Sequence, residues 1–233
     1  MSTLHVSTGV RGSTGSRVWH GLLLAVALAS LVWQFVLVVQ GGTDVNSGAA
    51  GTAAPLGTRI LRFFSYFTIE SNILVAVCAF TLLRRPDRDG PGWRVLRLDT
   101  LLGIGVTGLV YGLLLAPKLH LTGEALVVTA GLHYVTPPAT LLGWLLFGPR
   151  GRIDRRTVGW AFLWPVAWIG WTLAHGAASG WYPYPFLDVS SLGYGTAVRN
   201  IVAVLAAALV GALLLVGIDR ALNPRDRDLP SYR

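Results

Sequence analysis

Residues 201–218 read IVAVLAAALVGALLLVGI, a run without a charged side chain. An α-helix needs roughly 20 predominantly apolar residues to cross the hydrocarbon core of a bilayer, and this run supplies most of them. Five further apolar stretches of similar length precede it. The sequence therefore predicts an all-α membrane protein, a bundle of six transmembrane helices at residues 18–40, 60–83, 98–116, 124–148, 157–177 and 195–218.

The composition of the chain agrees with a membrane location. Of the 233 residues, 53% are hydrophobic and only 13% are charged. A soluble domain carries about 25% charged residues to cover its surface, so these values exclude a soluble enzyme and a disordered chain. The single cysteine, Cys78, excludes an internal disulfide and a cysteine-based zinc site. No cofactor or metal is expected.

The basic residues orient the predicted bundle. Fifteen of the 19 lie before the first span, between the second and third, between the fourth and fifth, or after the sixth, all on one side of the membrane. Cytoplasmic loops are enriched in Lys and Arg, so both termini are predicted to be cytoplasmic. Residues 1–17 and 221–233 then form cytoplasmic tails around a transmembrane domain at 18–220, and the net charge of +8 implies no nucleic-acid partner. Arginine supplies 18 of the 19, which is typical of GC-rich bacteria and indicates a bacterial plasma membrane.

Polar side chains inside apolar spans are costly in hydrocarbon, so each needs a partner or a function. Most of them lie in the span 60–83. One row is spaced i, i+3, i+7 and shares one helical face, and a second row is spaced i, i+4, i+8. The first row is Ser65, Thr68 and Asn72, and the second is Arg62, Tyr66 and Glu70. Later spans add His133, Arg199 and Asn200.

Thr68 and His133 are predicted to lie at the same depth in the membrane. Counting 1.5 Å per residue from the outer end of each span puts Thr68 roughly 12 Å deep and His133 roughly 13 Å deep. The inner half of the bundle is expected to be almost purely apolar, so the polar groups converge on a pocket that opens outward. A hydroxyl and an imidazole in hydrogen-bonding distance are the minimal parts of a nucleophile–base pair that attacks a carbonyl.

Structural roles for the same residues stay open. A threonine in a span often bonds the carbonyl of residue i−4, and a histidine often bridges two helices. Arg62 or Arg199 can pair with Glu70. Asn72 and Asn200 can each hold two helices together.

An aromatic, proline-rich loop precedes the last span, where residues 181–188 read WYPYPFLD. Proline restricts the backbone, so we expect a rigid cap over the mouth of the bundle, with Asp188 holding the loop or touching a substrate. The span 157–177 carries a stripe of tryptophans that we expect to pack against neighbouring helices: Trp164, Trp168 and Trp171.

Three motifs stand out: YFTIESN at residues 66–72, LHYVTP at 132–137 and WYPYPFLD at 181–188. Together they resemble the bacterial Pr-six-Pr family of integral membrane proteins, over roughly residues 18–220. That family is distantly similar to the eukaryotic androgen-induced-gene family, in which a threonine and a histidine hydrolyse fatty acid esters of hydroxy fatty acids. The resemblance implies a six-helix bundle and places the nucleophile on Thr68, the base on His133 and the aromatic-Pro-Phe-Leu-acid motif on Tyr184–Asp188. Eukaryotic members carry an acid three residues after the threonine, where this chain has Ser71.

The leading hypothesis is an intramembrane lipid-ester hydrolase that acts on membrane lipids or a lipid-like substrate, with Thr68 as nucleophile and His133 as base. Residues expected to bind substrate or support the site are Arg62, Ser65, Tyr66, Glu70, Asn72, Tyr184, Asp188, Arg199 and Asn200. Candidate oxyanion donors are Asn72, Ser65 and Tyr66, and candidates to bind a fatty-acid carboxylate are Arg62 and Arg199.

Two other hypotheses remain. Charge inside the spans is typical of proton relays, so a transporter or proton-coupled carrier is the second. A scaffold whose polar groups only hold helices together is the third.

Overall fold

The computed structural model describes residues 9–48 and 54–223, and within them the chain is helical with no β-strand. The α-helices are α1 (Gly9–Gln40), α2 (Leu56–Ser65), α3 (Phe67–Arg84), α4 (Pro91–Val110), α5 (Gly123–Thr129), α6 (Thr136–Phe147), α7 (Arg155–Ala161), α8 (Leu163–Ser179) and α9 (Val189–Ala221). Two π-helical segments, η2 (Tyr111–Leu115) and η4 (Ala130–Val135), continue α4 and join α5 to α6. Short 3₁₀ turns form η3 (Ala116–Lys118) and η5 (Pro185–Leu187).

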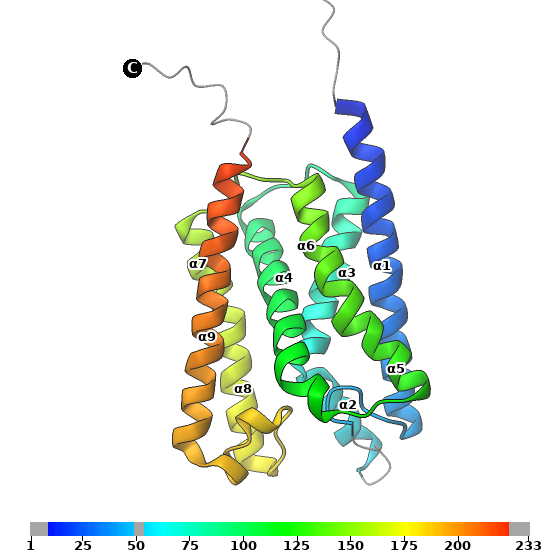
Figure 1. The fold of residues 1–233 in the computed structure, drawn as a ribbon, viewed down its shortest axis with the longest axis vertical. Coiled ribbons are helices and arrows are strands. Elements are labelled where there is room, and N and C mark those ends of the chain that lie inside the picture. The colour runs from blue at the N-terminus through cyan, green and yellow to red at the C-terminus, as the bar shows by residue number, and fades with distance from the viewer. Residues whose placement is uncertain (1–8, 49–53, 224–233) are drawn as a thin grey trace, which may run out of the picture.

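Among the described residues, five helical segments are long and apolar enough to cross a membrane: 14–40, 67–84, 91–118, 123–147 and 189–221. The predicted span at 157–177 is instead divided at Phe162 into α7 and α8. Figure 1 shows these two helices following one another along α9. The prediction of a helical membrane protein is therefore confirmed at the level of five apolar helices.

Different helices form the two ends of the bundle. The start of α1 and the end of α9 lie at one end, together with α7, whereas α2 and α5 lie at the opposite end (Figure 1). The predicted tails fall outside the described residues at 1–8 and 224–233, and α1 already begins inside the predicted tail 1–17.

The second predicted span is not one continuous helix. Tyr66 is extended, with φ −77° and ψ 126°, and separates α2 from α3. Its carbonyl accepts the N–H groups of Ile69 and Glu70, so it begins the new helix. The predicted rows through Ser65 and Tyr66 are therefore wrong, because residues before and after the break no longer share a helical face. The break puts Thr68 in the first turn of α3.

Proline accounts for the π-helical turn before α6. A proline has no N–H for the carbonyl of residue i−4 and its ring crowds that carbonyl. Pro137 and Pro138 therefore leave the carbonyls of His133 and Tyr134 without their usual donors. The backbone widens over η4, and such turns often occur at functional sites.

The helices that carry η2 and η4 approach each other closely. A Cβ added to Gly108 of α4 would lie 2.9 Å from Cβ of Pro137 in α6, so only glycine permits this contact. The contact draws η2 toward η4. A cluster of buried side chains surrounds the same region, and its aromatic members are Phe63, Tyr66, Tyr111, Trp168 and Tyr184.

Candidate functional site

Thr68 and His133 meet inside the bundle. The Thr68 Oγ1 lies 3.3 Å from the His133 Nε2, and both residues are only 3% exposed. Thr68 comes from the first turn of α3 and His133 from η4, 65 positions later in the chain. The structure therefore brings together the hydroxyl and the imidazole that the sequence placed at one depth.

The other ring nitrogen of His133 has its own partner. The Thr129 Oγ1 lies 3.0 Å from His133 Nδ1 and donates to the Tyr111 hydroxyl over 3.0 Å. Because the Thr129 hydroxyl donates its hydrogen bond to Tyr111, its oxygen accepts a hydrogen bond from the Nδ1–H of His133. The Nε2 lone pair is then directed at the Thr68 hydroxyl. This is the tautomer that a base acting on Thr68 needs.

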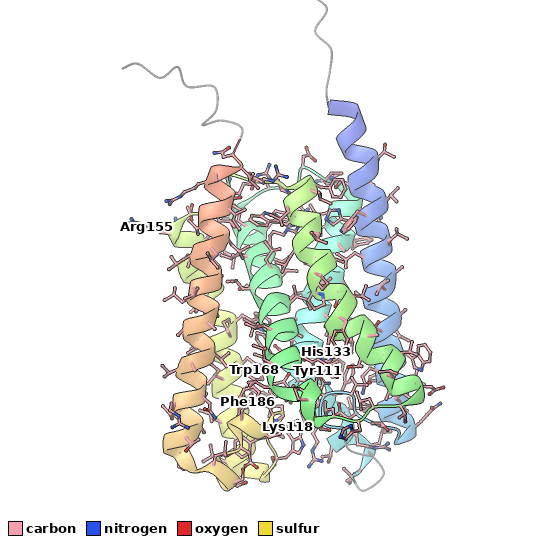
Figure 2. All side chains as sticks on the ribbon, in the orientation of Figure 1. Tyr111, Lys118, His133, Arg155, Trp168 and Phe186 are labelled. Carbon is pink, nitrogen blue, oxygen red and sulfur yellow. The ribbon has the colours of Figure 1, made fainter. Side chains whose placement is uncertain are left out.

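Tyr111 also fixes the plane of the imidazole. Its ring stacks on His133 with centroids 3.7 Å apart and planes inclined by 19°. Figure 2 shows the two side chains next to each other, in the half of the bundle away from the termini, with Trp168 and Phe186 on the side of α8 and α9. Stacking and the Thr129 contact together leave His133 one orientation.

Tyr184, from the loop between α8 and α9, completes the surroundings of Thr68. Its hydroxyl lies 3.2 Å from the Thr68 Oγ1 and accepts the Thr68 N–H, also over 3.2 Å. Since the first N–H groups of a helix have no partner within it, Tyr184 satisfies one such donor of α3. The phenol O–H remains free to donate to Thr68 or to a ligand.

The Asn72 amide donates its hydrogen bonds to backbone carbonyls and is not directed at a ligand. Its Nδ2 donates to the Thr68 carbonyl over 2.9 Å and to the Leu132 carbonyl over 3.3 Å. Ser65 donates to the Leu61 carbonyl over 2.8 Å. Neither of these donors is available as the oxyanion donor that the sequence suggested.

Tyr66 is also occupied elsewhere. Its phenol forms a hydrogen bond with Asp44, in the loop after α1, and its ring packs edge-on against Trp181 and Tyr184. Burial raises the pKa of the Asp44 carboxyl, and hydrogen bonds from Asn46 and Tyr66 oppose that rise. Tyr66 therefore ties the loop after α1 to the surroundings of the site, and its phenol is not directed at Thr68 or His133.

The tryptophans of α8 are hydrogen-bonded as well as packed. Trp164 Nε1 donates to Glu70 Oε2 over 2.7 Å, and its ring stacks on Phe67. Trp168 donates to the Ser65 carbonyl and Trp171 to the Ser65 hydroxyl. The expectation of a stripe that only packs was incomplete, because these indoles join α8 to the break between α2 and α3.

The predicted pairing of an arginine with Glu70 is wrong. The ion pairs of the described residues are Arg94 and Arg152 with Asp89, at the end of the bundle that holds the termini. Arg62 instead lies over the Trp181 ring, 5.0 Å from its centroid. Arg199 is exposed. Neither Arg62 nor Arg199 lines the cavity beside Thr68, so the structure does not place them for binding a carboxylate there.

Asp188 and Asn200 hold the loop that presents Tyr184. Asp188 is the N-cap of α9, where it accepts the N–H groups of Ser190 and Ser191. The Ser190 hydroxyl and these N–H groups keep the pKa of Asp188 below its usual value. Asn200 Nδ2 donates to the Phe186 carbonyl over 2.8 Å.

A narrow apolar cavity, with about 70 Å³ of free volume, adjoins the Thr68–His133 pair. It extends between α4, α8 and α9, from Thr68, Tyr111 and Tyr184 at one end to Asp99 and Ala161 at the other. Most of its walls are aliphatic or aromatic. This apolar lining suits a hydrocarbon chain.

The cavity continues into a groove between α4 and α9. The groove has a free volume of about 440 Å³ and shares Val106, Val110 and Val204 with the cavity. Two of its walls, Leu109 and Leu113, are 53% and 67% exposed. The groove is therefore open at the outer surface of the bundle, between the two helices.

The expectation of an almost purely apolar inner half was wrong. Asp99 lines the cavity near the start of α4, and Arg97, two residues earlier, is buried. Thr129 was not predicted as a site residue. Its position four residues before His133 puts the two side chains on the same face of a helix, so the spacing could have identified it. Among the described residues, no group of three His, Cys, Asp or Glu side chains is placed to hold a metal ion.

Comparisons of the chain with models of protein families, with curated proteins and with solved structures find no match.

Proposed function

We propose that this chain is an intramembrane hydrolase that cleaves carboxylic esters of lipid-like substrates, with Thr68 as nucleophile and His133 as base. The observation that carries the proposal is the 3.3 Å separation of Thr68 Oγ1 and His133 Nε2 beside an apolar cavity. We further propose six spans, with α7 and α8 together as the fifth, both termini cytoplasmic and a bacterial plasma membrane location. The motifs at residues 66–72, 132–137 and 181–188 support a relationship to the Pr-six-Pr family.

The reaction begins with addition of the Thr68 oxygen to the ester carbonyl. As the C–O bond forms, the Thr68 proton passes to His133 Nε2, and His133 then gives it to the departing alkoxide. The product of this half is an alcohol and an acyl-threonine. Water then adds to the acyl carbon, again losing a proton to His133, and the fatty acid leaves as Thr68 regains its proton.

Negative charge that develops on the carbonyl oxygen needs a donor. The Tyr184 phenol is the side-chain donor nearest to the Thr68 oxygen from the loop side, at 3.2 Å. Thr68 also lies in the first turn of α3, where the helix dipole favours negative charge. These two features support an oxyanion site made by Tyr184 and the start of α3, in place of the donors expected from the sequence.

The chemistry of the cavity supports a hydrocarbon-rich substrate. A chain lying in it buries apolar surface at roughly 25 cal/mol per Å². Access from the lipid between α4 and α9 suits a substrate that is already dissolved in the membrane. The proposed substrate is therefore an ester with at least one long alkyl or acyl chain.

Labelling by an active-site fluorophosphonate tests the proposal on the purified full chain in detergent. We expect Thr68→Ala and His133→Gln to lose labelling and ester hydrolysis, and Thr68→Ser to keep both. Two buried residues outside the site provide matched controls. Among the described residues, Thr140 donates to its own i−4 carbonyl, and His20 bonds Ser16 and packs edge-on against Phe147. Neither contacts Thr68 or His133, so Thr140→Ala and His20→Gln should label like the parent.

Labelling that is unchanged in Thr68→Ala and His133→Gln would contradict the hydrolase. Uptake of a substrate into proteoliposomes without hydrolysis would favour the carrier, for which Asp99 inside the cavity is the motivating observation. Loss of thermal stability in both variants, with neither labelling nor uptake in the parent, would favour the scaffold.

A further inference from the structure

Four residues of α4 and η2 form a line along the cavity. Asp99, Gly103, Thr107 and Tyr111 follow each other at intervals of four, and all four line the cavity. Each interval advances about 6 Å along a helix, so Asp99 lies roughly 18 Å from Tyr111. Tyr111 stacks on His133, which places Asp99 at the far end of the cavity from the reacting groups.

Thr107 is a buried hydroxyl without a partner. It is 5% exposed, and its Oγ1 forms no hydrogen bond with the described part of the chain. A threonine in a helix ordinarily bonds the carbonyl of residue i−4, which here is Gly103, but no such bond forms. An unsatisfied buried hydroxyl costs about 1–3 kcal/mol, so a partner inside the cavity is favoured.

Asp99 also lines the cavity without a partner among the described residues. Within residues 9–48 and 54–223, its carboxyl takes part in no hydrogen bond or ion pair. The neighbouring cations do not pair with it: Arg94 pairs with Asp89 over 2.7 Å, and Arg97 donates from Nη1 to Cys78 Sγ over 3.4 Å while its Nε and Nη2 are buried without a partner among the described residues. A carboxyl at the end of an apolar cavity gains most from a ligand that donates a hydrogen bond.

Gly103 keeps the middle of the line free of a side chain. A Cβ at this position would lie 2.7 Å from the Trp164 ring, which the Glu70 hydrogen bond holds in place. The Trp164 ring therefore packs directly on Gly103, and the two residues form one wall of the cavity between Asp99 and Thr107.

We infer that the cavity selects a chain whose far end carries a hydroxyl or an ammonium group, bound by Asp99, while Thr107 donates to an oxygen of the ester. The inference rests on the proposed function for the direction of the chain, with the ester at Thr68. A free carboxylate at the far end is disfavoured, because Asp99 is the one charged residue among the residues that line the cavity. The preferred substrate thus differs from fatty acid esters of hydroxy fatty acids, which carry a free carboxylate.

A set of esters with chains of equal length tests the inference. The probes are a fatty acid methyl ester, its ω-hydroxy and ω-amino analogues, and the monomethyl ester of the corresponding diacid. Binding is measured by titration calorimetry on the Thr68→Ala protein, so that no turnover occurs. Hydrogen bonds to charged groups contribute about 1.5–3 kcal/mol, so the hydroxy and amino esters should bind about ten- to a hundredfold more tightly than the methyl-ended ester.

Variants distinguish the role of Asp99 from that of Thr107. Asp99→Leu should abolish the preference among end groups, whereas Thr107→Val should weaken all four esters by a similar factor. Asp87→Asn, at an exposed acid outside the cavity, should leave binding unchanged. An order of affinities that is the same in Asp99→Leu, or tightest binding by the diacid monoester, would overturn the inference. Failure of the hydrolase proposal appears separately, as unchanged labelling in Thr68→Ala.

Discussion

Thr136 Oγ1 donates to Asn72 Oδ1 over 2.8 Å, and neither residue has any exposed surface. The same Asn72 amide donates to the carbonyls of Thr68 and Leu132, the latter next to His133 in the chain. One side chain therefore sets the spacing between the helix that carries the hydroxyl and the turn that carries the imidazole.

Asn72→Leu should destabilise the bundle and disturb the site together. It removes three hydrogen bonds from a buried location, and we expect a loss of about 2–4 kcal/mol in the free energy of unfolding. Thr136→Val is the control, because it removes the Thr136 donor alone and should cost about 1 kcal/mol. Thermal midpoints in detergent, measured beside fluorophosphonate labelling, check both values. Equal midpoints for the two variants would refute the bridging role.

Tyr184→Phe should reduce hydrolysis far more than stability. The change keeps the ring that packs on Tyr66 and removes the hydroxyl that holds the Thr68 N–H. Loss of one oxyanion donor typically lowers kcat about 10²–10³-fold. Tyr194 is 69% exposed, so Tyr194→Phe is the matched control and should keep the parent rate. A Tyr184→Phe protein with the parent kcat would exclude Tyr184 from the oxyanion site.

Thr129→Val should impair His133 without removing it. The isosteric change withdraws the acceptor of Nδ1–H, so the imidazole is no longer held with Nε2 as its basic nitrogen. We expect a fall of about ten- to a hundredfold in kcat, a part of the 10²–10⁴-fold contribution of a general base. Thr140→Val removes a comparable buried hydroxyl outside the site and should have little effect on kcat. Equal rates for the two variants would contradict the positioning role of Thr129.

Asp219 provides a test of stability away from the site. Its carboxylate accepts the N–H groups of Gly151, Arg152 and Ile153, which fastens the loop after α6 to the end of α9. Asp219→Ala leaves three donors without their acceptor and should lower the free energy of unfolding by about 3–5 kcal/mol. Asp87→Asn, exposed on the same end, should not shift the thermal midpoint.

The loop that presents Tyr184 should respond to pH through Asp188. Its pKa is lowered from 3.8 by the Ser190 hydroxyl and the first N–H groups of α9, so the folded state binds the proton less tightly than the unfolded state. The stabilisation is therefore complete above about pH 4 and is lost as the pH falls through the lowered pKa. The difference in thermal midpoint between parent and Asp188→Asn should shrink from pH 6 to pH 3. A difference that stays constant would contradict this contribution.

The apolar helices followed from the sequence, but their breaks did not. Apolar runs of about 20 residues are dictated by bilayer thickness, so length and hydropathy locate them. The extended backbone at Tyr66 depends on its contacts with Asp44, Trp181 and Tyr184, which lie far away in the chain. The periodicity of the local sequence does not predict contacts between residues so far apart in the chain.

The candidate site was predictable to a similar degree. Depth counting placed Thr68 and His133 at one level, and the two side chains do lie within hydrogen-bonding distance. The partners of this pair were harder to find, because Tyr184 arrives from a loop and Asp99 reaches the cavity from a stretch that reads as bland. Depth along a helix follows from counting residues, whereas direction around it depends on packing.

The groove between α4 and α9 has a consequence for how the proposed hydrolysis is assayed. A substrate that approaches from within the bilayer is diluted by lipid and not by water, so its total concentration in the sample does not set the rate. Saturation should follow the mole fraction of ester in the membrane, and adding inert phospholipid at constant ester should slow turnover.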